Sequence, residues 1–188
     1  MNAFNADGAG QAVLRFTVSG CALGYVLLAG RDADIRAVLL GDTEDALLAE
    51  LRRRFPGKRL VRDDAWLTGW RERLVDGLAT AEAFDLPLAP EGTAFQQRVW
   101  QALREIPAGA TASYSEIARR IGSPRAARAV AGACAANPIA VLIPCHRVCR
   151  QDGSLSGYRW GVERKRRLLA AEGATWVNAG NDFRRSRG

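Results

Sequence analysis

Two prolines within four residues divide this chain of 188 residues into halves of different character. Pro87 and Pro90 lie in the stretch from Phe84 to Gly92. Because proline fixes φ and removes a backbone donor, this stretch cannot be helical, and we expect an extended linker. We therefore predict an N-terminal domain with its linker over residues 1–90, a C-terminal domain over residues 91–176 and a basic tail over residues 177–188.

Strand patterns dominate the first half. Leu14, Phe16 and Val18 alternate with polar residues, which is the period of a half-buried strand. Residues 22–29 and 35–40 are two further strand-like runs, and a turn begins between them. Three strands this close in sequence predict a small antiparallel three-stranded sheet.

Two helices are expected after this sheet. Asp42 would cap the first, over residues 42–55, which has acidic residues in its first turn and three arginines in its last, as the helix dipole prefers. The second covers residues 65–79. Its expected apolar face consists of Trp66, Trp70, Leu74 and Leu78.

Helix signals dominate the second half. Thr93 with Gln96 and Ser113 with Glu116 are capping-box pairs, each at an expected helix start. Gly122 is expected to end the helix that begins after Ser113.

A further helix is expected to begin at Ser123, with Pro124 in its first position. Two helices joined by a tight turn predict a helix-turn-helix within a mainly helical, winged-helix-like domain. Together with the sheet of the first half, this predicts an α+β fold.

This further helix consists largely of small residues, from Ala126 to Ala136. One interpretation is a core helix that packs closely against its neighbours. The other is a helix whose smooth surface enters a narrow groove, with Arg125 and Arg128 extending from it. The pattern leaves both interpretations open.

The positive charge of the chain is concentrated in its second half. Residues 1–90 hold 11 Lys or Arg against 13 Asp or Glu, whereas residues 91–176 hold 13 against 6. A basic half favours a polyanionic partner, most often nucleic acid, although a generally basic surface would give the same count.

The cysteines and the N-terminus bear on the cellular compartment. The four cysteines show no paired framework, and the first ten residues lack the basic start and apolar run of a signal peptide. No run is long enough to span a membrane. We expect a cytoplasmic protein with reduced thiols.

The sole histidine of the chain, His146, directly follows Cys145. A thiol is mostly protonated near neutral pH, and an imidazole can remove that proton directly or through a water molecule. An arbitrary Cys-His pair is more often a buried apolar residue beside a satisfied polar one. With one histidine and no Cys-x-x-Cys, neither a metal site nor a cofactor is expected.

The segment over residues 144–148, PCHRV, resembles the active-site signature of the O6-alkylguanine-DNA alkyltransferases. Residues 92–173 are similar to the whole C-terminal domain of that family, in order and without a gap. The version most resembles the methyltransferase half of bacterial Ada. The first half resembles the family's variable domain more loosely, which implies a ribonuclease-H-like domain.

The resemblance implies roles for five residues in the chemistry. Cys145 would accept the alkyl group irreversibly, His146 would activate it through a water molecule, and Glu172 would orient the imidazole. Asn137 would support the turn between the recognition helix and the active-site strand. Tyr114 would donate a proton as the guanine leaves.

The resemblance also implies contacts with DNA and with the substrate base. Arg128 would fill the space left by the flipped nucleotide. The other implied DNA contacts are Arg125, Ser113, Thr111, Ala127 and Ala129. In the base pocket, Tyr158 would form an aromatic wall, and Val148 and Arg159 would contribute backbone groups that read the guanine edge. Trp160 would lie beside the pocket. Because Trp160 stands where some relatives have glycine, we expect poor acceptance of large O6 groups such as benzyl.

The activity that the resemblance implies is DNA repair by direct damage reversal. A monomer without a cofactor would transfer the methyl group of O6-methylguanine, and less well of O4-methylthymine, from double-stranded DNA to Cys145. The target base must leave the stack, which costs a few kcal/mol. Small residues on a helix that enters a groove fit this task. Because the zinc-binding N-terminal module of Ada is missing, repair without regulation is expected.

Two other functions remain as alternatives. A non-catalytic protein could bind alkylated bases and recruit other factors, but such alkyltransferase-like proteins replace the acceptor cysteine. A cysteine hydrolase could use Cys145, His146 and Glu172 in many turnovers, but it would need neither a helix-turn-helix nor Arg128.

Overall fold

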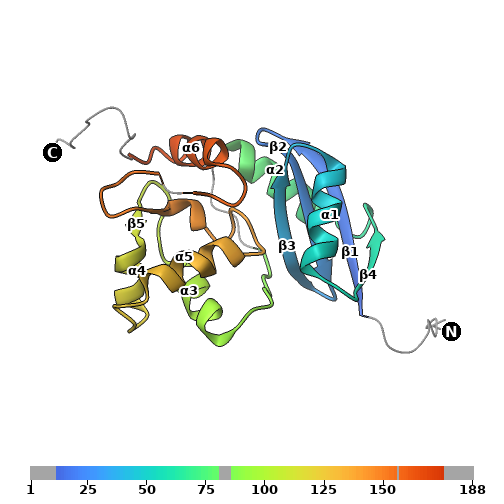
Figure 1. Ribbon diagram of the computed structural model, residues 1–188. Coiled ribbons are helices and arrows are strands. Elements are labelled where there is room, and N and C mark those ends of the chain that lie inside the picture. The colour runs from blue at the N-terminus through green and yellow to red at the C-terminus, as the bar shows by residue number, and fades with distance from the viewer. Residues whose placement is uncertain (1–11, 81–85, 156, 176–188) are drawn as a thin grey trace.

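The computed structural model describes residues 12–80, 86–155 and 157–175, which form two lobes (Figure 1). The predicted basic tail lies outside these residues. The predicted combination of a small sheet with helices and a mainly helical second half is confirmed. In chain order the elements are β1 (Val13–Cys21), β2 (Gly24–Arg31), β3 (Asp34–Gly41), α1 (Glu44–Arg54), β4 (Arg59–Arg62), α2 (Thr68–Thr80), α3 (Ala94–Arg104), β5 (Ala112–Ser113), α4 (Tyr114–Arg120), α5 (Ala127–Ala136), the 3₁₀ turn η1 (Cys145–Arg147), β6 (Val148–Cys149) and α6 (Val162–Ala171).

The sheet of the first lobe has one strand more than predicted. The three predicted strands form the antiparallel meander β3-β2-β1, and β4 adds to β1 in parallel, which gives the order β3-β2-β1-β4. None of the four residues of β4 is buried. A strand without a buried face lacks the alternating apolar pattern by which the others were predicted.

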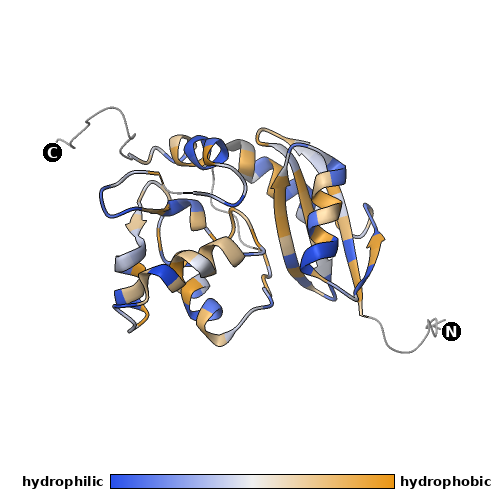
Figure 2. Ribbon diagram, in the orientation of Figure 1, coloured by the Kyte–Doolittle hydropathy of each residue, from blue (hydrophilic) through white to orange (hydrophobic). Residues whose placement is uncertain are grey.

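Both faces of this sheet are covered. Leu27 and Leu28 are neighbours in β2 and therefore point to opposite faces, yet both are fully buried. Helix α1 packs on β2 and β3, helix α2 packs on β1, and Figure 1 shows α1 in front of the sheet and α2 behind it. Figure 2 shows mostly hydrophobic residues along the central strands, whereas α1 and α6 carry many hydrophilic ones.

The helix starts of this lobe differ from the prediction by a few residues. Thr43, not Asp42, caps α1, because its hydroxyl accepts the backbone N–H of Ala46 at 3.2 Å. Helix α2 begins at Thr68, so Trp66 precedes it, and the Trp66 ring packs edge-to-face on Trp70. The apolar face of α2 is otherwise as expected, with Leu74 and Leu78 buried.

The described part of the proline-containing linker is extended, as predicted, and it is bound to the sheet. Ile35 donates its backbone N–H to the carbonyl of Pro87 at 2.7 Å and accepts that of Ala89 at 2.9 Å. These bonds place the linker along β3, the strand that faces the second lobe (Figure 1). The boundary at residue 90 stays a prediction.

Both predicted capping boxes of the second lobe are confirmed. The Thr93 hydroxyl accepts from the backbone of Gln96, whose side chain accepts from the Thr93 backbone, and Ser113 and Glu116 form the same reciprocal pair. Gly122 adopts a φ of 70°, which suits a glycine that ends a helix.

The predicted start of the following helix at Ser123 and Pro124 is wrong. Helix α5 begins at Ala127, and no side chain caps it. The carbonyl of Ser123 accepts the N–H of Ala126 at 2.9 Å, so residues 123–126 close a turn before the helix starts. Helices α3, α4 and α5 pack on one another, and the Trp100 indole of α3 donates to the Ala133 carbonyl of α5 at 2.9 Å.

Candidate active site

The segment before Cys145 is held by the sheet of the other lobe. Val38 of β3 donates its N–H to Pro138 at 3.0 Å and accepts the N–H of Ala140 at 2.8 Å. Beyond this bridge the chain turns, and Val141 takes a φ of 67°, which is uncommon for a β-branched residue. The expected active-site strand is therefore replaced by turns, and Cys145 and His146 lie in the 3₁₀ turn η1.

Asn137 joins the end of α5 to this turn. Its side-chain nitrogen donates to the Ile143 carbonyl at 2.9 Å and to the sulfur of Cys145 at 3.2 Å, and its oxygen accepts the N–H of Ile139 at 2.9 Å. All of these atoms are buried, so few alternative partners compete for the amide. One side chain thus ties the acceptor thiol to the backbone on both sides of the turn.

His146, which follows Cys145 in the chain, binds a carboxylate through its ring. Its Nε2 is 2.9 Å from Oε1 of Glu172, which also binds the guanidinium of Arg147, with Nε at 3.0 Å and Nη2 at 2.8 Å from the two carboxylate oxygens. Burial alone would raise the pKa of Glu172, but the hydrogen bonds from His146 and Arg147 outweigh it and lower the pKa to about 2. Glu172 is therefore ionised at neutral pH.

This carboxylate decides which nitrogen of His146 can act as a base. An ionised carboxylate only accepts hydrogen bonds, so Nε2 carries the proton of the neutral ring and Nδ1 keeps a free lone pair. Burial lowers the pKa of His146, although Glu172 opposes the shift, so the ring is neutral near pH 7. Nδ1 is buried and has no hydrogen-bond partner within the described part of the chain.

The thiol of Cys145 needs such a base. Burial raises its pKa, and the hydrogen bond from Asn137 and the charge of Lys165 only partly oppose the increase. Near neutral pH the sulfur is therefore protonated at rest. A neutral imidazole next along the chain can remove the proton, and the Asn137 amide stabilises the resulting thiolate.

Lys165 is a component of the site that sequence reasoning missed. It is fully buried on α6, where its ammonium donates to the Val148 carbonyl. Burial raises the pKa values of Cys134, Cys145 and Cys149, and the charge of Lys165 opposes this increase at each of them. Lys165, Leu168 and Leu169 recur at helical spacing on the buried face of α6. A lysine at the spacing of an apolar helical face could have predicted its burial. It was missed because the neighbouring residues of α6 are also basic.

Two residues of the expected base pocket, Tyr158 and Val148, have contacts with this centre. Tyr158 has its ring centroid 6.5 Å from that of His146, and its hydroxyl is buried without a hydrogen-bond partner in the residues described. Trp160 is 6% exposed. The Val148 carbonyl, expected to read the guanine edge, already accepts from Lys165, although a carbonyl can accept a second bond.

Of the other predicted site residues, Tyr114 and Ser113 begin α4 beside the centre. Tyr114 is half-buried and packs against the core. The Ser113 hydroxyl and N–H are both used in the capping box with Glu116, so its predicted DNA contact has to compete with these bonds. Thr111 is half-buried and lines a surface hollow together with Ser113, Arg119 and Arg150.

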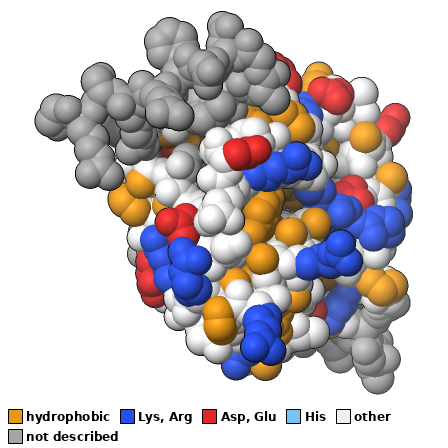
Figure 3. All heavy atoms as spheres, turned by 60° about the vertical axis from the view of Figure 1, so that its left-hand side comes forward, with side chains coloured by type: hydrophobic (Ala, Val, Ile, Leu, Met, Phe, Trp, Pro, Cys, Tyr) orange, Lys and Arg blue, Asp and Glu red, His pale blue; other side chains and the backbone are white. Residues whose placement is uncertain are grey.

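Helix α5 has a face that packs in the core and a face that is exposed, and its entry into a groove stays a prediction. Val130, Ala133 and Cys134 face the core, whereas Arg128, Ala129, Gly132 and Ala135 are exposed. A Cβ added to Gly132 would meet no atom within 4 Å, so this outer face is smooth and open. Figure 3 shows arginine and lysine side chains around a strip of apolar ones on this side of the molecule.

The basic residues beside this face are exposed. Arg125 and Arg128 are both exposed, and Ala127 is half-buried at the start of α5. Cys149 is buried and packs against Leu169 and Ala174.

The described residues contain no group of three or more His, Cys, Asp or Glu side chains that could hold a metal ion. Among the same residues, no helix has both the length and the apolar character that crossing a membrane requires.

Comparisons with known proteins agree with the resemblance. A family model described as "6-O-methylguanine DNA methyltransferase, DNA binding domain" matches residues 94–174. The Escherichia coli "Bifunctional transcriptional activator/DNA repair enzyme Ada" is 47% identical over 166 residues, which are 88% of this chain and 47% of that protein. The "Methylated-DNA--protein-cysteine methyltransferase" of Methanosarcina barkeri is 43% identical over 150 residues, which are 80% of this chain and 91% of the relative.

The solved structures show the same relationship. "Mycobacterium tuberculosis OGT in complex with DNA" superposes with a TM-score of 0.73 at 37% identity, covering 85% of this chain and 92% of that one. This chain spans about half the length of its Escherichia coli and Salmonella typhimurium relatives. On the combined similarity in sequence and structure, the chain belongs to the family of O6-methylguanine DNA methyltransferases, the methylated-DNA–protein-cysteine methyltransferases.

Proposed function

We propose that this protein repairs double-stranded DNA by moving the alkyl group of O6-methylguanine, and less well of O4-methylthymine, onto Cys145. The observation that carries the proposal is a pair of hydrogen bonds, one from Asn137 to the sulfur of Cys145 and one between Glu172 and the imidazole of the adjacent His146. Asn137 directly follows α5, whose outer face is exposed. The relative from Mycobacterium tuberculosis has been solved with DNA.

The reaction follows from the protonation states of the site. Nδ1 of His146 takes the thiol proton, directly or through a water molecule, and Glu172 stabilises the imidazolium. The thiolate attacks the methyl carbon, so a C–S bond forms, the C–O6 bond breaks and its electron pair stays on the guanine. Tyr114 returns a proton to the base. Because the thioether is stable, each protein molecule acts once, as a monomer and without a cofactor.

The exposed face of α5 is the proposed DNA contact. We propose that α4 and α5 act as a helix-turn-helix, that the face with Ala129 and Gly132 enters the minor groove, and that Arg128 occupies the space of the flipped nucleotide. Arg125, Thr111, Ser113 and Ala127 complete the predicted contacts. Tyr158, Val148, Arg159 and Trp160 form the predicted base pocket.

The test is a single-turnover assay. Protein is incubated with a duplex that carries one O6-methylguanine, digested and analysed by mass spectrometry. We expect a methylated peptide containing Cys145, in an amount limited by the protein, and none in a Cys145→Ser variant. Cys149→Ser is the matched control and should react as the wild type does. Binding without modification would favour a non-catalytic reader, and repeated turnover of small esters would favour a hydrolase.

A further inference from the structure

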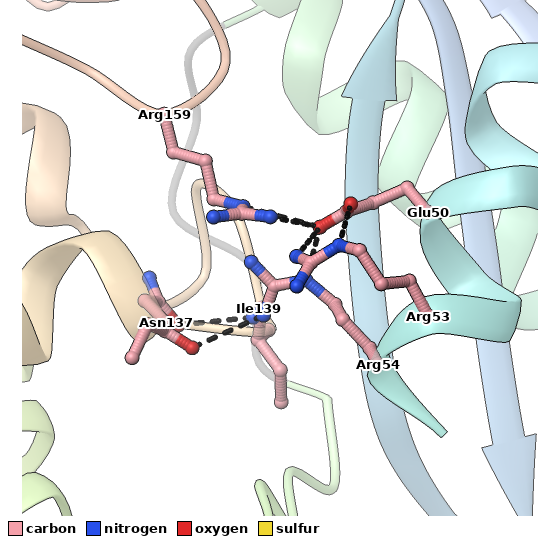
Figure 4. A network of polar contacts seen from close by, with 7 residues as sticks. Glu50, Arg53, Arg54, Asn137, Ile139 and Arg159 are labelled. Atoms are coloured by element: carbon pink, nitrogen blue, oxygen red, sulfur yellow. Dashed lines mark hydrogen bonds and ion pairs between the residues drawn. The ribbon is translucent and has the colours of Figure 1, made fainter. Parts of the chain in front are cut away.

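Helix α1 of the sheet lobe carries a carboxylate that is bound from both lobes. Glu50 accepts hydrogen bonds from Arg53 and Arg54 of its own helix, with Nε of Arg54 at 2.6 Å. It also forms an ion pair with Arg159 of the second lobe, whose Nε lies 3.2 Å from Oε1 (Figure 4). Burial raises the pKa of Glu50, but these arginines outweigh it and lower the pKa to about 2.

Arg54 extends from the same helix to the end of α5. Its Nη1 donates to the carbonyl of Ala136 at 3.0 Å, and its side chain is only 9% exposed. Figure 4 shows it between Glu50 and the segment that begins at Asn137. The guanidinium carbon also lies 5.3 Å from the ring centroid of Trp160, so the contact includes a cation–π interaction.

The two contacts lead to two different parts of the predicted site. Ala136 immediately precedes Asn137, the residue that donates to the sulfur of Cys145. Arg159 stands between Tyr158 and Trp160, the two aromatic residues of the predicted base pocket. Glu50 and Arg54 therefore connect one helix of the sheet lobe to both the nucleophile and the pocket.

We propose that Glu50 and Arg54 are positioning residues for the transfer reaction, which hold the Ala136 carbonyl and the Arg159 loop where the acceptor thiol and the pocket need them. The inference rests on the proposed function for its substrate. It extends that function by giving the sheet lobe a part in it, although none of the predicted site residues lies in that lobe.

Burial makes these contacts effective. Exposed ion pairs contribute little, because water screens them and long side chains lose freedom in forming them. Glu50 and Arg54 are 19% and 9% exposed in their side chains, and removal of Glu50 would leave the buried guanidinium of Arg54 without its carboxylate. A shift of the reacting groups by about 1 Å can slow an enzyme by ~100-fold.

Arg54 also acts on the thiol through its charge. The titratable or charged groups around Cys145 are His146, Lys165, Arg54, Cys134 and Tyr158. Of these, Lys165 and Arg54 favour the thiolate and so lower the pKa of Cys145. A purely structural contact between lobes would not change the protonation of this sulfur, so the pH profile reports the effect of the Arg54 charge separately from its effect on the position of the thiol.

The experiment compares Arg54→Gln with Arg52→Gln, which changes an exposed arginine two residues earlier on the same helix. Two quantities are measured on folded protein: the single-turnover rate on methylated duplex, and the pH profile of Cys145 alkylation by iodoacetamide, read from its peptide. For Arg54→Gln we expect a rate about 10-fold lower and a profile shifted to higher pH. Arg52→Gln should match the wild type in both.

A second comparison tests the contact between Glu50 and Arg159. Glu50→Gln is the variant, and Glu44→Gln is its matched control. Glu44 lies on the same helix but pairs with Arg62 of its own lobe. Glu50→Gln and Arg159→Gln should each slow transfer, and the double variant should be no slower than Glu50→Gln alone, because that variant already removes the ion pair with Arg159.

Wild-type rates and an unshifted pH profile in folded Arg54→Gln would overturn the proposal, as would additive losses in the double variant. Should Arg54→Gln fail to fold, Arg54→Lys replaces it in the experiment. This variant keeps the charge but loses the planar guanidinium that binds Glu50 and the Ala136 carbonyl. We then expect slower transfer with an unshifted pH profile, and an unchanged rate would count against positioning. If the wild type modifies no DNA, the proposed function fails, while the iodoacetamide profile still tests Arg54.

Discussion

The amide nitrogen of Asn137 lies 3.2 Å from the sulfur of Cys145 and donates a hydrogen bond to it in a buried site. This bond links the end of α5, whose outer face is exposed, to the atom that is proposed to react. The same amide binds the Ile143 carbonyl and the Ile139 N–H, so the bond to sulfur has a fixed direction.

Replacement of Asn137 by Ala is expected to slow single-turnover methyl transfer by about 10- to 100-fold, because a hydrogen bond to a charged group contributes about 1.5–3 kcal/mol. It should also lower the free energy of unfolding by about 1–3 kcal/mol, since two backbone groups lose their partner. Rates come from quenched time points on methylated duplex, and stability from urea unfolding. Asn137→Asp, which is nearly isosteric, should raise the pKa of the thiol, and an unchanged rate in both variants would contradict the assigned role.

Acid should destabilise the protein through Glu172 and His146. The pKa of Glu172 falls from 4.5 to about 2 on folding, so its contribution is present above pH 4.5 and is lost as the pH falls through about 2. Burial lowers the pKa of His146 below 6.5, so the unfolded state also binds its proton first and stability declines below that pH. The Glu172 shift corresponds to roughly 3 kcal/mol.

Glu172→Gln is expected to remove the Glu172 part of this dependence and to slow transfer, because the amide no longer stabilises the imidazolium. Urea unfolding between pH 3 and pH 7 measures the slope. Glu163→Gln, which changes an exposed carboxylate on α6, is the control and should keep the wild-type slope. Equal slopes for both variants would show that Glu172 does not carry the effect.

Trp160 should limit the size of the alkyl group. It is buried and has the guanidinium groups of Arg54 and Arg159 at 5.3 and 5.6 Å from its ring, so it cannot readily move aside. Trp160→Gly is expected to increase the rate of inactivation by free O6-benzylguanine at least ~10-fold relative to methyl transfer. The cavity should cost ~3–5 kcal/mol of stability. Trp66→Gly in the other lobe is the control, and rapid inactivation of the wild type would refute the size limit.

Arg128 is predicted to act only when DNA is present. Arg128→Ala should lower the transfer rate on duplex DNA by about 10-fold or more, since the flipped nucleotide loses its replacement in the stack. The reaction with free O6-methylguanine base should stay within about twofold of the wild type, because no base pair has to open. Arg52→Ala controls for the loss of charge. An equal decrease on both substrates would place Arg128 in the chemistry rather than in base flipping.

The local features of this protein could be predicted from its sequence. Capping boxes at Thr93 and Ser113, the alternation of the first three strands and the PCHRV segment depend on residues close together in the chain, so short-range patterns predicted them. The same reasoning failed at Ser123 and Pro124, where a turn and a helix start have the same preferred residues.

The tertiary structure alone decided which distant residues complete the site. Strand β4 has no buried face, and its pairing with β1 is what makes it a strand. Lys165 is separated from Val148 by 17 residues and Arg54 from Ala136 by 82, and no periodicity marks either as a partner of the active-site turn. Burial determines the pKa of Cys145 and of His146, and burial exists only once both lobes have folded around them.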